Sequence, residues 1–174
     1  MNKKLVTVVG FIIIAAITAT YMYLGGLNKV EYTVESVSDY NLIGVPFVGD
    51  GDSKKIEEAY EEAKQYVLND QYDGVLTLVH YNDSTLEEGQ VKFFIGIKLN
   101  VGISDIPANY QRLTIPAKYS ARASIEAHNS VMPSPGTIEE SLREKAAEAN
   151  LRLQDFTIEQ YVSENLLMID MPAK

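Results

Sequence analysis

The sequence predicts an α+β fold in which a strand–helix–strand–strand unit occurs twice, behind one N-terminal transmembrane helix. Two amphipathic helical patterns are each followed by two strand-like segments, and the chain begins with a 20-residue run that carries no charge. A helix buries one stripe and a sheet one face, so we expect both helices on one side of a sheet. The duplication implies a pseudo-twofold axis, where a cleft is a natural ligand site.

The uncharged run covers residues 5–24, which is the length that an α-helix needs to cross a hydrocarbon core of about 30 Å. Tyr21 and Tyr23 lie at its far end, where aromatic residues favour the membrane interface. A cleavable signal peptide is the alternative, but its apolar region usually spans only about 7–15 residues. The predicted division is a cytoplasmic stub (1–4), a transmembrane helix (5–24), a short flexible linker (25–30) and a ligand-binding domain (31–174).

The charge pattern orients the chain and limits its partners. Lys3 and Lys4 precede the apolar run and only Lys29 follows it closely, so the positive-inside rule predicts a single-pass protein with an extracytoplasmic domain. Beyond the run there are 24 acidic and 13 basic residues, a net charge of −11. Such a domain repels phosphate backbones, so we expect no nucleic-acid partner. The acidity either attracts cations or serves solubility alone.

The first unit follows from local patterns. Residues 29–37 alternate as a strand does, and 41–49 continue that character, with Pro46 marking an edge or a bulge. A helix is expected from Ser53 to about Asn69. Its apolar stripe comprises Ile56, Ala59, Tyr60, Ala63 and Val67. Strands are then predicted over 74–83 and 91–99, the second with strict alternation.

The second unit repeats this order. A strand is predicted over 112–128, and the turn at 133–137 leads into a helix with a capping box of Thr137 and Glu140. The stripe of this helix comprises Ile138, Leu142, Ala146 and Ala149. Strands over 156–163 and 166–173 close the chain. Residues 74–83 and 155–164 occupy equivalent places in the two units, each with a tyrosine, Tyr81 and Tyr161.

Several kinds of chemistry are excluded. The chain has no cysteine, hence no disulfides, thiolate metal sites or cysteine nucleophiles. The two histidines, His80 and His128, lie on different strands without metal-ligand spacing. Asp50 and Asp52 alternate but lack the glycine and glutamate of an EF-hand loop. We therefore predict no metal, no cofactor and no catalytic residues.

Glu159 is the residue on which a functional prediction depends. It stands within FTIEQYVS, among residues typical of strands. Its carboxylate either faces water on the polar side of the sheet or lies in a pocket that receives a positive group. Tyr161 lies two residues further along the strand and so shares its face.

Four segments in order resemble the GyrI-like small-molecule-binding family, the effector-binding domain of bacterial transcription activators. They are GVLTLVHYND, QVKFFIGIKL, IPANYQRLTIPAKYSARASIEAH and IEQY. The resemblance covers about residues 31–172 and implies the duplicated strand–helix–strand–strand fold. Two departures are clear: the DNA-binding arm of the activators is replaced by the apolar run, and the chain has no tryptophan.

The resemblance also implies a function. Family members bind lipophilic, often cationic compounds in a central cleft with aromatic walls and a glutamate on the penultimate strand, which Glu159 matches by position. Candidates for the walls are Tyr161, Tyr119, Phe94 and Tyr81. An aromatic box attracts a delocalised cation, and a desolvated carboxylate supplies the opposite charge.

Three functions remain open on this basis. The first is a membrane-anchored module that senses or sequesters a small amphipathic, cationic molecule. The second is a GyrI-like hydrolase acting on reactive lipophilic compounds, in which Glu159 activates water and Glu126 is the second carboxylate. The third is a protein-interaction module without a ligand, docking through its acidic surface.

Overall fold

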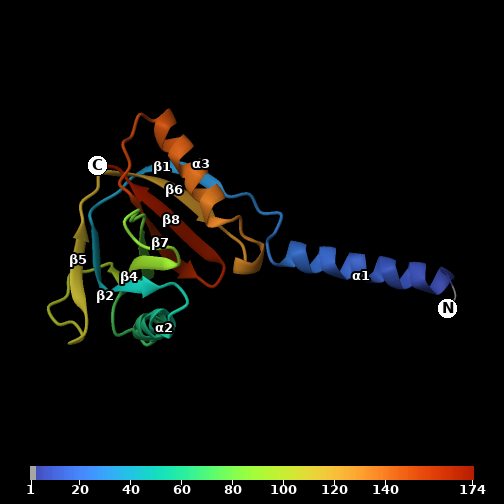
Figure 1. Cartoon of the computed structure of the whole chain (residues 1–174), viewed down its shortest axis with the longest axis horizontal. Helices are drawn as coiled ribbons and strands as arrows, with labels where there is room; N and C mark the ends of the chain where they lie inside the picture. The colour runs from blue at the N-terminus through green and yellow to red at the C-terminus, as the bar shows by residue number, and fades with distance from the viewer. Residues whose placement is uncertain (1–2) are drawn as a thin grey trace.

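The computed structural model describes residues 3–174, without the side chains of residues 3–5, 8 and 129 (Figure 1). Within that range the chain forms three α-helices and eight strands. In order they are α1 Lys3–Tyr23, β1 Glu31–Ser36, β2 Tyr40–Asp50, α2 Lys54–Leu68, β3 Gly74–Tyr81, β4 Gln90–Leu99, β5 Gln111–Ile115, β6 Tyr119–Ile125, α3 Pro135–Glu148, β7 Phe156–Ser163 and β8 Leu166–Pro172.

The predicted duplication is confirmed. The strands form one antiparallel sheet in the order β1-β6-β8-β7-β3-β4-β2-β5. Its first unit is β2-α2-β3-β4 and its second is β6-α3-β7-β8, with β1 and β5 added at the two ends. The units meet where β3 pairs with β7, so this central pair contains the pseudo-twofold axis.

Both α2 and α3 cover the same face of the sheet, as predicted. A row of cross-strand neighbours runs over this face as Ile97, Leu76, Tyr161, Leu167 and Ile125. The first two pack with Ala63 of α2, and the last two with Leu142 of α3. Neighbours in one row point to one side of a sheet, so both helices lie on that side, α2 over the first unit and α3 over the second.

The helix starts follow capping chemistry. Ser53 caps α2, its hydroxyl accepting from the Lys55 N–H at 3.4 Å, in agreement with the predicted start. The predicted capping box of α3 is wrong. Ser134 is the N-cap, and its hydroxyl accepts from the N–H of Thr137 at 3.3 Å. Pro135 then occupies the first helical turn, where its missing N–H costs nothing.

The single strand predicted over 112–128 is in fact two. Pro116 cannot donate to a sheet, and β5 ends just before it. The chain then turns, with the Ala117 N–H bonded to the Asp39 carboxylate at 3.2 Å. Because β5 pairs with β2 while β6 pairs with β1 and β8, this turn connects opposite ends of the sheet.

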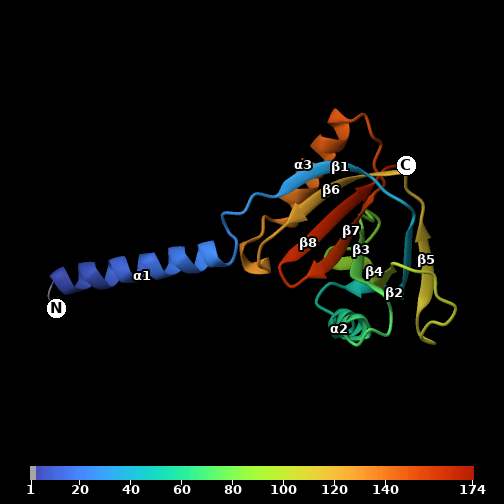
Figure 2. The same ribbon diagram turned by 180° about the vertical axis from the view of Figure 1, so that it is seen from behind.

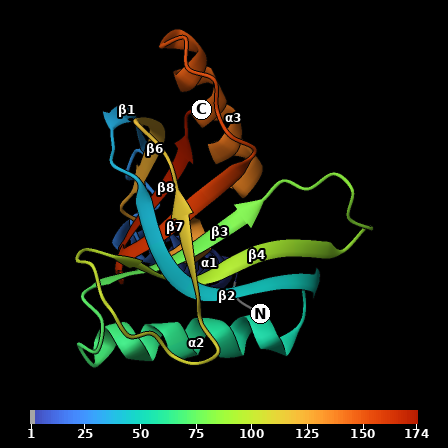
Figure 3. The same cartoon turned by 90° about the vertical axis from the view of Figure 1, so that its left-hand side faces the viewer.

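The sheet is strongly curled. Only residues 37–39 connect β1 to β2, which lie six positions apart in the strand order. In a flat sheet that separation would be roughly 29 Å, whereas such a connection spans at most about 14 Å. Figure 3 shows the chain running directly from β1 into β2. The face without helices therefore encloses an interior, filled by Tyr40, Leu42, Val79, Phe94, Ile115, Ala117 and Ile158.

A polar cluster, here called the interior network, lies on this enclosed face. The Asp170 carboxylate is fully buried and accepts from Arg122 Nε at 2.7 Å, Arg122 Nη2 at 2.8 Å, the Tyr40 hydroxyl at 2.8 Å and Gln160 Nε2 at 2.8 Å. Lys98 Nζ donates to Gln160 Oε1 at 2.7 Å. Burial lowers the pKa of Lys98, whereas the hydrogen bonds to Asp170 raise the pKa of Arg122. A buried carboxylate is tolerated here because charged and neutral donors surround it.

Helix α1 extends away from the domain (Figures 1 and 2). Its exposed large apolar side chains include Val6, Val9, Phe11, Ile12, Ile13, Ile14, Ile17, Tyr21, Met22 and Tyr23. Among the residues that the structure describes, no helix has both the length and the apolarity required to cross a membrane. The transmembrane helix predicted at residues 5–24 is therefore not supported. Residues 1–2 of the predicted stub lie outside the described residues.

We predict that Arg122→Met lowers the free energy of unfolding by about 3 kcal/mol, because it leaves the Asp170 charge buried without its cationic partner. Chemical denaturation followed by circular dichroism measures this. Lys145→Met is the control: it removes only the exposed ion pair with Glu148 (2.8 Å), and we expect a loss below about 0.5 kcal/mol. Equal losses in the two variants would contradict a stabilising role for the network.

Candidate ligand-binding cleft beside helix α2

Glu159 lies at the meeting point of the two units. It is on β7, opposite Leu78 of β3 and Ile169 of β8, and its side chain is half-buried on the face that α2 and α3 cover. The hydroxyl of Tyr161 donates a hydrogen bond to Glu159 Oε2 at 2.9 Å. Of the two alternatives for this glutamate, the structure therefore places it on the packed face rather than in open solvent.

The environment of Glu159 disfavours its charged form. Burial raises the pKa of the carboxyl above 4.5, its ordinary value. The hydrogen bond from Tyr161 and the electrostatic effect of nearby His80 lower the pKa of Glu159, but both effects are smaller than that of burial. Burial and the neighbouring carboxylate likewise raise the pKa of the Tyr161 hydroxyl, which stays a proton donor. A desolvated carboxylate with one neutral donor is poised to receive a positive charge.

A second tyrosine completes the aromatic part of the site. Tyr60 of α2 packs edge-to-face on Tyr161, with ring centroids 5.3 Å apart and an interplanar angle of 87°. The sequence places Tyr60 only in the apolar stripe of its helix. Its position in the stripe, facing the sheet, is the same as that of a core residue, so no local pattern distinguishes a wall residue from a core residue.

A cavity of about 370 Å³ opens beside this aromatic pair, within the size range of small-molecule sites. Glu159 does not itself line the cavity, but its hydrogen-bond partner Tyr161 does. Lys64 reaches the cavity as well, and its ammonium is paired with Glu61 at 3.5 Å. The lining comprises Tyr60, Lys64, Val67, Leu68, Leu76, Met132, Tyr161, Val162, Ser163, Glu164, Leu166 and Leu167.

The structure does not bring the other predicted wall residues to this cavity. Tyr81 and Phe94 point to the enclosed face, where Phe94 is 5% exposed within the interior cluster. The small residue beside Phe94, Gly96, makes room for backbone rather than for a ligand, because a Cβ there would collide with the Ile43 carbonyl oxygen. Tyr119 lies at the start of β6 and lines a separate cavity of about 440 Å³. Of the five predicted residues, Glu159 and Tyr161 are brought together.

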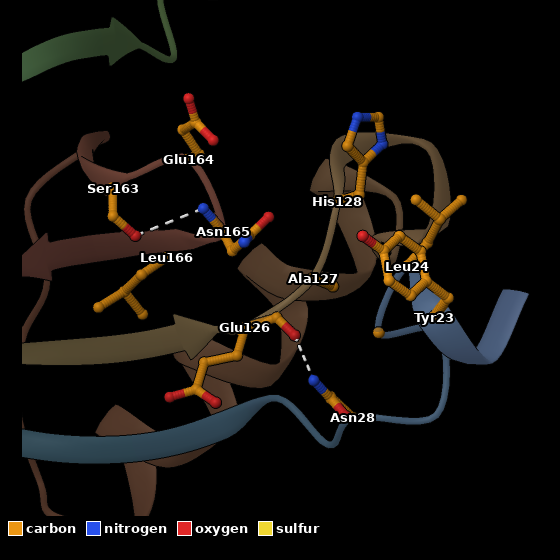
Figure 4. Close-up of a pocket in the computed structure, with 11 residues that line it drawn as sticks. Tyr23, Leu24, Asn28, Glu126, Ala127, His128, Ser163, Glu164, Asn165 and Leu166 are labelled. Atoms are coloured by element: carbon orange, nitrogen blue, oxygen red, sulfur yellow. Dashed lines mark hydrogen bonds between the residues drawn. The ribbon is translucent and has the colours of Figure 1, made fainter. Parts of the chain in front are cut away.

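A larger cavity, of about 710 Å³, lies where α1 meets the domain (Figure 4). Its walls are the end of α1, the turn between β7 and β8, and the segment after β6. Hydrogen bonds order this junction: the His128 N–H donates to the Leu24 carbonyl at 2.9 Å, and Asn28 Nδ2 to the Glu126 carbonyl at 2.6 Å. A Cβ on Gly25, whose φ is +81°, would lie 2.8 Å from the Glu126 carbonyl oxygen.

Glu126 belongs to this junction and not to the cleft. Its neighbour Ile125 pairs with Leu167 of β8, which in turn pairs with Tyr161 of β7. Glu126 and Glu159 are thus two strands and three residues apart, roughly 14 Å between their backbones. The two carboxylates cannot act on one reacting atom in this arrangement.

Comparison with known proteins supports the fold. No model of a known protein family matches the chain, and no curated protein matches it. Solved structures do. SAV2435 bound to tetraphenylphosphonium matches with a TM-score of 0.51 at 15% identity, over 83% of this chain and 94% of that one. The EcmrR C-terminal domain matches with a TM-score of 0.56 at 12% identity, over 83% of this chain and 98% of that one. A hydrolase from Listeria innocua matches with a TM-score of 0.56 at 10% identity, over 83% of this chain and 92% of that one.

These likenesses, each over 83% of this chain, agree with a GyrI-like fold, as the resemblance predicted. At such identities they concern the fold alone. The arrangement of Glu159, Tyr161 and Tyr60 comes from the structure of this chain.

We predict that Glu159 makes stability fall as pH rises. Its pKa is raised in the folded state, so ionisation opposes folding between pH 4.5 and the raised pKa. The free energy of unfolding of the wild type relative to Glu159→Gln should decrease across this interval when both are denatured with urea at a series of pH values. A difference that stays constant with pH would show that Glu159 titrates as an exposed residue.

Proposed function

We propose that this protein binds a small lipophilic cation in the cleft between α2 and the β7–β8 hairpin, as a sensing or sequestering module. The observation that carries the proposal is the half-buried carboxylate of Glu159, hydrogen-bonded to Tyr161 beneath an aromatic pair. Glu159 supplies the opposite charge, and Tyr60 and Tyr161 supply the aromatic walls.

The physical basis is that the unliganded site holds the negative charge of Glu159 in a buried place, with no salt bridge to it among the described residues. Burial disfavours the Glu159 carboxylate, so a cation that enters restores favourable electrostatics without a change in covalent structure. Tyrosine faces attract a delocalised cation by roughly 0.5–2 kcal/mol each, more when water is excluded. The apolar lining, which includes Leu76, Val67 and Met132, suits a hydrophobic body around the charge.

The comparison with solved structures adds support of a different kind. SAV2435 has the same fold as this chain and was solved bound to tetraphenylphosphonium, a permanent cation inside an apolar shell. That ligand has no proton to donate, so its recognition would depend on the charge and aromatic contacts that the cleft of this protein offers. It is therefore a suitable first probe.

Hydrolysis is the second candidate function. The Tyr161 hydroxyl lies 2.9 Å from Glu159, as close as two groups that share a proton in general acid–base catalysis. A Listeria innocua protein described as a hydrolase shares the fold. The proposed partner Glu126 lies too far away, so any hydrolytic role would fall to the Glu159–Tyr161 pair, acting on an electrophilic lipophilic compound.

We predict that the full-length protein binds tetraphenylphosphonium, and that Glu159→Gln weakens binding by at least about tenfold, because the neutral amide no longer offsets the cation. Equilibrium dialysis with detergent-solubilised protein measures the affinity. Binding to the wild type should strengthen as pH rises through the raised pKa of Glu159, since the ionised carboxylate is the form that binds.

Glu144→Gln is the matched control for this experiment. It removes one negative charge from the exposed surface of α3 and should leave the affinity unchanged. Equal losses in both variants would reduce the effect to general electrostatic attraction. Retention of full affinity in Glu159→Gln would contradict the proposed role of this glutamate.

We further propose that α1 attaches the domain to a membrane through its exposed apolar side chains, with the domain on the extracytoplasmic side. The exposed apolar side chains of α1 support this, since such a surface is unfavourable in water. Full-length protein should float with vesicles in a density gradient. Protease that reaches the outer side of an intact cell membrane should cleave the domain. A chain without residues 1–24 that floats equally well would contradict attachment through α1.

A further inference from the structure

Gln160 stands between the two residues of the cleft. Alternation along β7 directs Glu159 and Tyr161 to the helix-covered face, and Gln160 to the enclosed face. Its side chain is 1% exposed. The backbone that carries Gln160 is the same backbone that positions Glu159, so a constraint on one side chain is transmitted directly to the other.

Both ends of the Gln160 amide are held. Nε2 donates to Asp170 Oδ2 at 2.8 Å, and Oε1 accepts from Lys98 Nζ at 2.7 Å. Each bond has a charged partner, and charge-assisted hydrogen bonds are stronger than neutral ones. The amide can therefore neither rotate nor withdraw without leaving a buried donor or acceptor unpaired.

The interior network joins the two units of the domain. Lys98 of β4 and Tyr40 of β2 belong to the first unit, whereas Gln160, Asp170 and Arg122 belong to the second. Lys98 reaches Gln160 across β3, and its ammonium lies 5.5 Å from the centre of the Tyr40 ring. The cleft is formed between these same units on the opposite face, so the network fixes the geometry that the cleft depends on.

The register of β7 requires such a constraint. The strand pairs regularly with β8 from Ile158 to Tyr161, and then the register shifts before Ser163. A slip by one residue would turn Glu159 into the interior and Gln160 into the cleft. A side chain held by two charged partners next to an irregularity resists that slip.

We propose that Gln160, held by Lys98 and Asp170, is a positioning residue that keeps Glu159 and Tyr161 in the cleft. The meaning of this role for ligand binding rests on the proposed function. Gln160 touches no ligand itself and acts through the backbone of β7.

The test measures the titration of the Glu159 carboxyl by NMR in detergent-solubilised full-length protein, without any ligand. The titratable groups around Glu159 are Tyr161, His80 and Tyr60, and the variants change none of them. In Gln160→Met, a loosened β7 admits water, so the Glu159 midpoint should fall from its raised value towards 4.5. Lys98→Met should produce the same shift, and Lys98→Arg, which can still donate to Gln160, should largely restore the midpoint.

Ile115→Ala is the matched control, because it weakens the same interior from β5, a strand that pairs with β2 and not with β7. It should lower stability and leave the Glu159 midpoint in place. Gln160→Met with an unchanged midpoint and a similar loss of stability would overturn the proposal, since Gln160 would then be only a structural residue.

Tetraphenylphosphonium affinity, measured on the same variants, separates this inference from the proposed function. Where the cation binds the wild type, we expect about tenfold weaker binding in Gln160→Met. Failure of the wild type to bind, with the midpoint shift still observed, would leave the positioning role intact and count against the cation as ligand.

Discussion

A carboxylate removed from bulk water is the constraint on which this site depends. Glu159 is placed where the two units meet, on a face that two helices cover, and only Tyr161 donates a hydrogen bond to it among the described residues. Burial makes the ionised form unfavourable, so the unliganded domain carries an electrostatic cost at its centre. Under the proposed function, a bound group of opposite charge would relieve that cost and so link the stability of the domain to ligand binding.

The duplicated topology explains how one strand can serve two purposes. The central pair β3–β7 has one face towards α2 and α3 and the other towards the enclosed interior. On the interior face, the fully buried Asp170 accepts hydrogen bonds from Arg122, Tyr40 and Gln160. On the helix face, Glu159 accepts one from Tyr161. Two acidic residues on neighbouring strands thus differ in their hydrogen-bond environments: within the part of the chain that the structure describes, Asp170 has three donor residues and Glu159 has one.

The sequence predicted much of the fold, because periodicity reports which face of an element is buried. The two helices, the sequence of strand, helix, strand and strand along each unit, and the shared face of Glu159 and Tyr161 all followed from local patterns. The break at Pro116 and the cap at Ser134 were missed, although proline chemistry could have indicated both. The curl of the sheet was not predictable, since it arises from pairing between segments far apart in the chain. Alternation along β3 and β4 directs Tyr81 and Phe94 to the face that this curl encloses, away from the cleft.

A crystal structure of the full-length protein with tetraphenylphosphonium would test the central claim most directly. We predict the phosphorus between α2 and the β7–β8 hairpin, phenyl groups against Tyr60 and Tyr161, and the Glu159 carboxylate behind Tyr161 as the counter-charge. A cation found in the junction cavity beside Glu126 would contradict this prediction. So would a cation bound at any other place that leaves the cleft beside Tyr60 and Tyr161 empty.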